Sequence, residues 1–225
     1  MIEDKKPEYG VFIIESMDLD NEVNGKLDGY TLKTILDLCE IPNQYFYIRT
    51  KLELEKVIEI FTDSNFGFLH IACHGNENSI MLTFEELDFE ELEEIIGDHL
   101  HHRRLFLSAC KAARFELAEH FIPKYHCYSV IGTPENIDYD KAAVFWSSFY
   151  YLMFDLNQVN MPQRDLWPIL DNVSKSFNLK LNYFSIINIK SLRSIDHLRE
   201  FNYESGKIIS DTVKKTKYKN IYLTE

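Results

Sequence analysis

The sequence lacks the features that mark several large classes of protein. Its 225 residues include only 8 glycines and 6 prolines, too few for a collagen-like or low-complexity chain. No apolar run approaches the length of roughly 18 residues that a membrane-crossing helix needs. Neither G-x-x-x-x-G-K-[ST] nor G-x-G-x-x-G occurs, which argues against a nucleotide-binding protein. We therefore expect no membrane span and no nucleotide site.

Positive charge is also scarce. Lys and Arg number 24 against 36 Asp and Glu, which gives a formal net charge of −12. Binding to DNA or RNA requires a cationic surface, so we expect no nucleic-acid partner. The first seven residues are charged and polar, and no apolar stretch follows them, so we expect no secretory signal. These features predict a cytoplasmic protein.

Closely spaced cysteines, such as C-x-x-C motifs, are absent as well. The four cysteines are far apart in the chain, at Cys39, Cys73, Cys110 and Cys127. Without a C-x-x-C pair, neither a zinc ribbon nor a thioredoxin motif is present, and we expect reduced thiols and no cofactor or metal. His70, Cys73 and His74 would not share one face of a strand, which disfavours a metal site there. We interpret Cys39, Cys73 and Cys127 as small core residues.

The hydrophobic pattern predicts strands alternating with helices. Short β-branched and aromatic runs indicate six strands, at residues 10–15, 45–48, 66–73, 104–109, 127–132 and 183–189. Helical spacing occurs at residues 30–39, 51–61, 87–97, 115–121, 139–154 and 166–177. We also expect an edge strand at 79–82, a capping box of Thr83 and Glu86, and a C-terminal cap at Gly97.

This alternation predicts an α/β fold, with a mostly parallel six-stranded sheet and helices on both faces. Residues 1–190 are assigned to this domain. Residues 191–225 are assigned to a helical or mobile extension, and the basic stretch 213–219 within it is interpreted as a solvated terminus.

Two of the predicted strands end in reactive side chains. One ends in His70-Ile-Ala-Cys-His74-Gly75, and the next long strand ends in Leu107-Ser-Ala-Cys110. Ligands of open parallel sheets bind beyond the carboxyl ends of the strands, so neighbouring strands would bring His74 and Cys110 together. An adjacent imidazole can convert a thiol to the reactive thiolate. The backbone N–H of Gly75 would lie beside the histidine, as an oxyanion site requires.

These two motifs resemble those of the caspase-like cysteine peptidases, most nearly the CHAT and separase-related branch. Residues 130–138 and 142–152 resemble a strand, loop and aromatic-bearing helix of that branch, and the resemblance extends over residues 10–189. It implies a caspase-hemoglobinase-like fold, with His74 and Cys110 as the catalytic dyad. It further implies an oxyanion site at the N–H groups of Gly75 and Cys110, and peptide-bond hydrolysis through a thioester acyl-enzyme.

The resemblance also implies a substrate and a partner. Non-animal relatives favour cleavage after a basic residue that an acidic residue binds, and Asp138 and Glu135 lie in the segment that resembles their pocket loop. Asp138 would serve equally well as a cap for the following helix. Because the chain lacks the large recognition regions of many relatives, we expect activation by a partner protein or small ligand. A role in bacterial antiviral defence or signalling is a hypothesis from the resemblance alone.

Other interpretations remain beside this one. A caspase fold used as a binding or scaffold module, without turnover, is the main alternative, although the presence of both His74 and Cys110 argues against it. The cluster His99, His101 and His102 is interpreted as a solvated loop rather than a metal or phosphate site. The acidic stretch 18–28 lacks the spacing of an EF-hand, so no calcium site is predicted.

Overall fold

The computed structural model describes residues 8–156, 161–186, 197–204 and 207–215. Its strands are β1 (Glu8–Ser16), β2 (Asn43–Tyr47), β3 (Phe66–Gly75), β4 (Ser79–Met81), β5 (Glu86–Asp88), β6 (Arg104–Ser108), β7 (Ser129–Gly132), β8 (Leu181–Ile186), β9 (His197–Glu204) and β10 (Lys207–Lys215). Its helices are α1 (Leu19–Val23), α2 (Asp28–Leu38), α3 (Lys51–Ser64), α4 (Phe89–Ile96), the short 3₁₀ helix η1 (Gly97–Leu100), α5 (Phe115–Tyr125), α6 (Tyr139–Leu156) and α7 (Gln163–Phe177).

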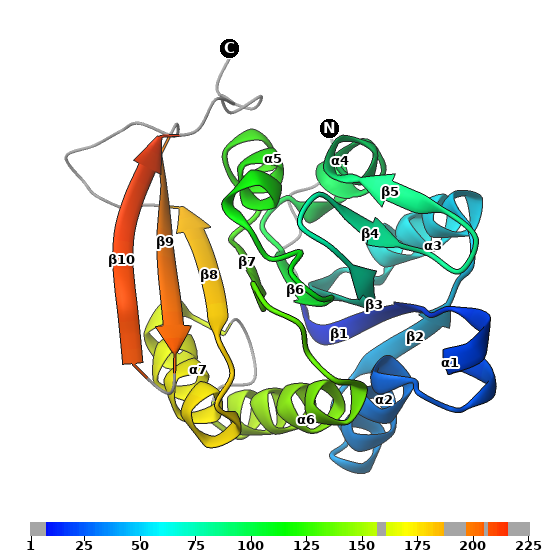
Figure 1. Cartoon of the computed structure of the whole chain (residues 1–225), viewed down its shortest axis with the longest axis horizontal. Helices are drawn as coiled ribbons and strands as arrows, with labels where there is room; N and C mark the ends of the chain where they lie inside the picture. The colour runs from blue at the N-terminus through cyan, green and yellow to red at the C-terminus, as the bar shows by residue number, and fades with distance from the viewer. Residues whose placement is uncertain (1–7, 157–160, 187–196, 205–206, 216–225) are drawn as a thin grey trace.

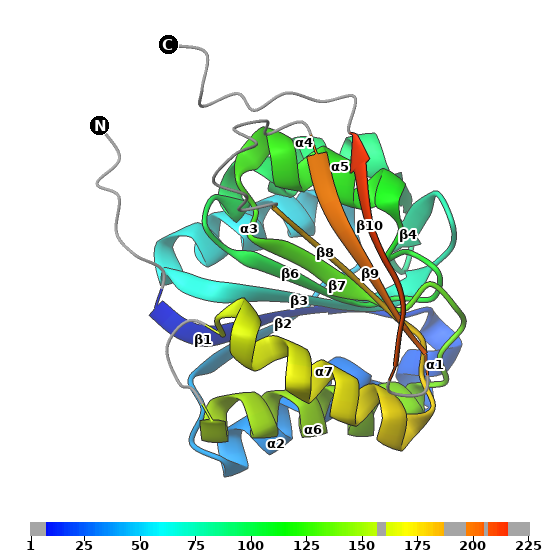
Figure 2. The ribbon, with the colours of Figure 1, turned by 90° about the vertical axis from the view of Figure 1, so that its left-hand side faces the viewer.

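The strands form one sheet in the order β10-β9-β8-β7-β6-β3-β1-β2, with β4 and β5 attached beside β3 (Figure 1). The strands β2, β1, β3, β6 and β7 are parallel, whereas β8, β9 and β10 are antiparallel to their neighbours. Helices α3, α4 and α5 cover one face, and α2, α6 and α7 cover the other (Figure 2). Each face has its own apolar core. The predicted α/β fold, with a mostly parallel central sheet flanked by helices, is confirmed.

All six predicted strands are present, but the sheet is larger than predicted. It holds ten strands among the described residues. The expectation of helix or mobility after residue 190 is wrong for β9 and β10, which continue the sheet from β8. Such polar segments become strands through pairing with a neighbour, and their own sequence carries little signal. Residues 187–189 of the sixth predicted strand lie outside the described residues, and the domain division at residue 190 stays a prediction.

Of the two predicted caps around α4, the capping box is wrong and the C-terminal cap is confirmed. The capping box is formed by Asp88 and Glu91, five residues further along, because Glu86 belongs to β5. The Thr83 hydroxyl instead donates to the Met17 carbonyl at 2.7 Å and so ties the β4–β5 turn to the end of β1. Gly97 is the C-cap of α4, as predicted, and its N–H donates to the Glu93 carbonyl. It keeps right-handed helical geometry, so the chain continues directly into η1.

The carboxyl ends of three central strands meet at one edge of the sheet. Ser16 of β1 pairs with Cys73 of β3, and Ala72 of β3 pairs with Ser108 of β6. The segments that follow these strands are therefore brought together. None of the described helices combines the length and hydropathy that crossing a bilayer requires.

Candidate active site

His74 and Cys110 lie at this shared edge. His74 is the penultimate residue of β3, and Cys110 lies in the turn after β6, two residues beyond the strand. Both side chains line one cavity of about 220 Å³. Its other lining residues include Asp28, Ser108, Ile137, Asp138 and Tyr139. The structure thus brings together the two residues that the strand-end motifs singled out.

The His74 ring is held by side chains from α1 and α6. Its Nε2 lies 3.0 Å from Asp18 Oδ2, 3.0 Å from the Asn21 side-chain amide and 2.8 Å from the Tyr139 hydroxyl. The Asp18 carboxylate caps α1, and a hydrogen bond from the Asn21 backbone N–H, reinforced by His74, lowers its pKa. Asp18 is therefore an ionised acceptor that can orient the imidazole and stabilise its protonated form.

The Cys110 thiol contacts backbone rather than the histidine. Its Sγ accepts a hydrogen bond from the Ile137 N–H at 3.4 Å and lies 3.6 Å from the Ile137 carbonyl oxygen. Among the described residues, no hydrogen bond joins the thiol to the His74 ring. Catalytic hydrogen bonds are often long in unliganded enzymes and tighten when substrate binds. His74 and Cys110 therefore line the same cavity, but the Cys110 thiol is hydrogen-bonded to the Ile137 backbone.

A glycine lets the two strand ends approach closely. A Cβ at Gly75 would lie 2.9 Å from the Cys110 carbonyl oxygen and 3.1 Å from the Ala109 Cβ. The residue after Cys110, Lys111, has a φ of 59°, a left-handed conformation that costs a non-glycine residue energy. The backbone at Gly75 and Cys110 is therefore tightly constrained, and its role in binding an oxyanion stays a prediction.

The two predicted substrate-binding acids occupy different places. Asp138 lines the cavity, is exposed, and its side chain has no hydrogen-bond partner among the described residues. Its carbonyl accepts the Ala142 N–H at the start of α6, so it is the backbone and not the carboxylate that meets this helix end. Glu135 lies outside the cavity lining and pairs with Lys180 at 2.7 Å. The structure thus brings Asp138 to the cavity and leaves Glu135 beside it.

A buried aspartate at the cavity was missed by the sequence analysis. Asp28 is the first residue of α2, is only 4% exposed and lines the cavity. The Ser108 hydroxyl, two residues before Cys110, donates to Asp28 Oδ2 at 2.6 Å. Burial raises the pKa of Asp28 to about 6. No cation pairs with this carboxyl in the described part of the chain.

A second buried acid lies beside it. Glu15, at the end of β1, is fully buried and accepts hydrogen bonds from the N–H groups of Gly29 and Tyr30 and from the Tyr45 hydroxyl. Burial, followed by repulsion from Asp28, raises its pKa to about 7. The sequence did carry a signal for Glu15, since a carboxylate ends an otherwise apolar strand. Nothing in the sequence showed that α2 would begin over it.

The remaining histidine and cysteines of this region are structural. His70 is fully buried against Trp146 and Tyr150, and burial lowers its pKa to about 3, so it is a neutral interior side chain. Cys73 and Cys127 are buried, and burial raises the pKa of both thiols, that of Cys127 to about 12. The prediction for Cys39 holds in part, because this residue packs against the core beside α2 and α6 but remains partly exposed. No group of three metal-ligating side chains is assembled among the described residues.

Comparisons with known proteins give little beyond this geometry. No family model matches the chain, and no curated protein matches it. Among solved structures, it is similar to caspase-1 from Spodoptera frugiperda, with 13% identity and a TM-score of 0.49. The similarity covers 76% of this chain and 78% of the caspase chain. Such a remote likeness concerns architecture alone, so the function is argued from the cavity.

Proposed function

We propose that the protein is a caspase-like cysteine endopeptidase. The observation that carries this proposal is the shared cavity of His74 and Cys110, with the His74 ring held by the ionised Asp18. A thiol, an imidazole and a carboxylate that orients the imidazole are the groups that acyl transfer through a cysteine requires. All three come from segments at the carboxyl edge of the sheet.

The reaction follows from these groups. The Cys110 thiolate attacks the peptide carbonyl, forming the C–S bond, and the N–H groups of Gly75 and Cys110 stabilise the oxyanion. Protonated His74 gives its proton to the leaving amine as the C–N bond breaks, which leaves a thioester. Neutral His74 then takes a proton from water, whose oxygen attacks the thioester and releases the acid product and Cys110. Asp18 acts as a positioning residue that stabilises the His74 imidazolium.

Activation in this proposal means freeing the thiol. In the structure Sγ is hydrogen-bonded to the Ile137 backbone. Movement of this segment would release the thiol for contact with His74. A substrate, a partner protein or a small ligand that displaces residues 136–138 would accomplish this. An activating partner or ligand, a cytoplasmic location and a role in defence belong to this proposal as hypotheses.

The cavity favours a substrate with a basic side chain. Asp28 lies buried at its wall without a cation, and Asp138 adds an unpaired carboxylate nearby. An ammonium or guanidinium group would supply the missing positive charge and hold both acids ionised. We therefore propose cleavage after Lys or Arg, with Asp28 and Asp138 as the binding acids and Glu135 in the supporting position given by its pair with Lys180.

The second candidate function is a binding or scaffold module without turnover. The observation that favours it is the absence of a hydrogen bond between the His74 ring and the Cys110 thiol among the described residues, together with the occupation of the thiol by Ile137. In such a module the cavity would bind a basic peptide segment without cleaving it.

Hydrolysis of fluorogenic peptides separates the two candidates. The peptides carry Arg, Lys, Asp or Leu before the fluorophore and are tested with the wild type, Cys110→Ala and Cys39→Ala, which changes the other partly exposed thiol. The proposal expects turnover of Arg and Lys peptides that Cys39→Ala retains and Cys110→Ala loses. Turnover retained by Cys110→Ala would refute the peptidase assignment. Basic peptides that bind the wild type and remain intact would favour the binding module over a peptidase that the substrate itself activates.

A further inference from the structure

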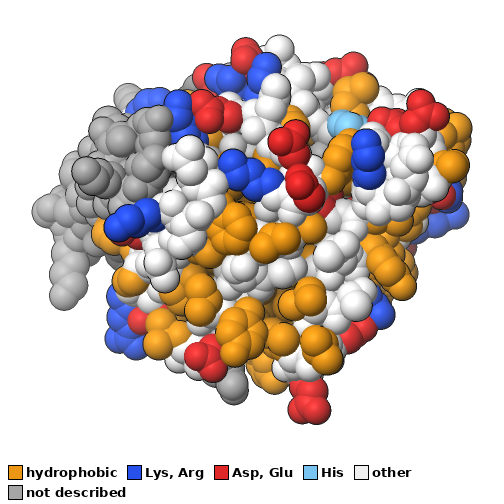
Figure 3. Space-filling model, turned by 60° about the horizontal axis from the view of Figure 1, so that its bottom comes forward, with side chains coloured by type: hydrophobic (Ala, Val, Ile, Leu, Met, Phe, Trp, Pro, Cys, Tyr) orange, Lys and Arg blue, Asp and Glu red, His pale blue; other side chains and the backbone are white. Residues whose placement is uncertain are grey.

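A second surface feature lies on the helices α2 and α6, away from the cavity. Large apolar side chains are exposed along these two adjacent helices, at Tyr30, Leu38, Val144, Tyr151 and Leu156. Figure 3 shows hydrophobic side chains gathered on the face that these helices form. Single exposed apolar residues are ordinary, but a concentration of them on one face marks an interaction surface.

The two helices enclose a groove on this face. A hollow of about 350 Å³ is lined by Ile35 of α2 and by Ser147, Ser148, Tyr151 and Leu152 of α6.

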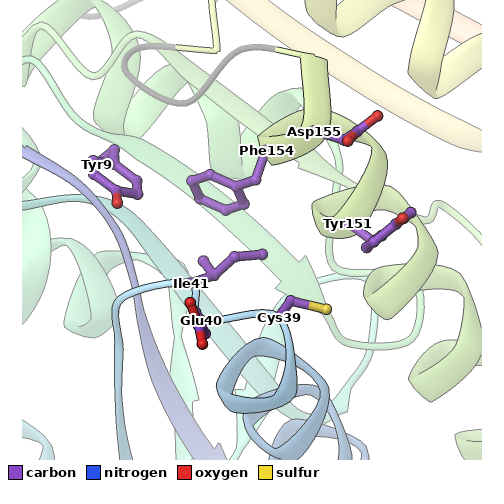
Figure 4. A pocket seen from close by; sticks show the side chains of 7 residues that line it. All are labelled: Tyr9, Cys39, Glu40, Ile41, Tyr151, Phe154 and Asp155. Carbon is purple, nitrogen blue, oxygen red and sulfur yellow. The ribbon is translucent and has the colours of Figure 1, made fainter.

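The groove continues to the carboxyl ends of both helices. A second hollow of about 170 Å³ lies there, and Tyr151 lines both hollows. Figure 4 shows the rings of Tyr9 and Phe154 next to each other above Ile41, with Glu40 on the turn after α2 and Asp155 on α6. We call the two hollows together the α2–α6 groove.

The far end of the α2–α6 groove is negatively charged. Glu40 and Asp155 are both exposed, and neither forms an ion pair within the described residues. Helices α2 and α6 end at Leu38 and Leu156, so the negative ends of two helix dipoles point in the same direction. An apolar channel that ends in two carboxylates is complementary to an apolar segment that ends in positive charge.

We propose that the α2–α6 groove docks a partner protein through an amphipathic helix with Lys or Arg at one end. Apolar residues at helical spacing would fill the hollow between Ile35 and Tyr151, and the basic end would meet Glu40 and Asp155. A second copy of this chain is a poor occupant, because it carries the same net charge of −12.

This surface is linked by its helices to the candidate active site. Helix α2 begins at Asp28, which lines the cavity, and α6 begins at Tyr139, which contacts His74. A partner seated in the α2–α6 groove therefore contacts the same two elements that hold site residues at their other ends.

The test uses labelled synthetic peptides and the Cys110→Ala protein, so its outcome does not depend on whether the chain is a peptidase. The probe is a helical peptide of about 14 residues with leucines on one face and three lysines at the end that would face Glu40 and Asp155. Its control has glutamates in place of the lysines. Fluorescence anisotropy measures binding to this protein, to its Tyr151→Glu variant and to its Glu40→Lys/Asp155→Lys variant. Phe84→Glu, at an exposed apolar residue between β4 and β5, is the matched control.

The proposal expects the lysine peptide to bind at least about tenfold more tightly than the glutamate peptide. Tyr151→Glu should weaken binding by about tenfold or more, the charge-reversed variant should prefer the glutamate peptide, and Phe84→Glu should change nothing. Equal affinity for both peptides, no binding, or an equal loss in Phe84→Glu would overturn the proposal. Sedimentation that reveals a dimer dissociated by Tyr151→Glu would overturn it in favour of a self-interface.

Discussion

Glu93 and Glu15 are both buried glutamates, but they lie on opposite faces of the sheet and have different partners. Glu93 of α4 accepts from His120 Nδ1 at 2.5 Å and from the Tyr125 hydroxyl at 2.9 Å, and it forms an ion pair with Lys124. Within the described residues, the hydrogen bonds to Glu15 all come from neutral donors, and its acidic neighbour is Asp28.

The pKa values follow these partners. Burial raises the pKa of Glu93, but hydrogen bonds from Lys124, His120 and Tyr125 outweigh it and hold the pKa below its ordinary value. With no such cation, the pKa of Glu15 rises to about 7. The first acid stabilises the packing of α4 against α5. Glu15 and Asp28, the latter at the cavity, have no cationic partner among the described residues and could interact with a positively charged ligand.

The largest expected effect is on stability, from Glu93→Ala. The substitution leaves the largely buried His120 and the Lys124 side chain without their acid, and loss of one partner of a buried pair costs about 3–5 kcal/mol. Asp28→Asn removes no ion pair and should change the free energy of unfolding by less than about 1 kcal/mol. Urea denaturation at neutral pH measures both. Similar costs for the two variants would show that the acids do not differ in the way described.

The next effect is on the pH dependence of stability. The folded state retains the Glu15 proton between the ordinary pKa of 4.5 and about 7, while the unfolded state has lost it, so stability falls as pH rises through this window. Glu15 contributes at most about 3 kcal/mol to this loss of stability, and Glu15→Gln should abolish that contribution.

Glu93→Gln should act in the opposite direction. A lowered pKa contributes stability above the ordinary pKa of 4.5 that is lost as pH falls, so this variant should lose most at neutral pH. Denaturation midpoints between acidic and slightly alkaline pH test the two slopes. The same sign for both would contradict the comparison.

A third effect concerns the substrate. If Asp28 binds a basic side chain, Asp28→Asn should raise the activation free energy for kcat/KM with Arg peptides by about 1.5–3 kcal/mol, which lowers kcat/KM by a factor of roughly 10 to 150. Peptides with the neutral isostere citrulline should lose much less. Glu135→Gln is the control acid outside the cavity. Equal losses for Arg and citrulline peptides would show that Asp28 does not meet the substrate charge.

The smallest expected effect comes from Asp18→Asn. Because the Asp18 side chain is half exposed, removing its charge should lower kcat by only about tenfold and leave KM nearly unchanged. The loss should depend on pH, because the Asp18 charge stabilises only the imidazolium form of His74. Asp20→Asn, on the same short helix and without contact to His74, is the matched control. An unchanged pH profile would leave Asp18 with a structural role only.

The sequence predicted the parts of this molecule that rest on local pattern. The apolar runs identified the central strands, and the two strand-end motifs placed His74 and Cys110 at one edge of the sheet. What it could not predict depends on distant contacts. Asp28 reaches the cavity only because α2 begins over β1, and Glu135 leaves the cavity because Lys180, far along the chain, pairs with it. Strands β9 and β10 exist through their pairing with β8.

The central claim is that His74 activates Cys110, and the most direct measurement compares two thiols in one protein. Cys110 and Cys39 are both partly exposed, whereas Cys73 and Cys127 are buried. Timed alkylation with iodoacetamide, followed by peptide mass spectrometry, gives a rate for each residue in the wild type and in His74→Ala. The account predicts that Cys110 reacts faster than Cys39 and that His74→Ala removes this advantage without changing the Cys39 rate. A Cys110 rate that does not depend on His74 would contradict it.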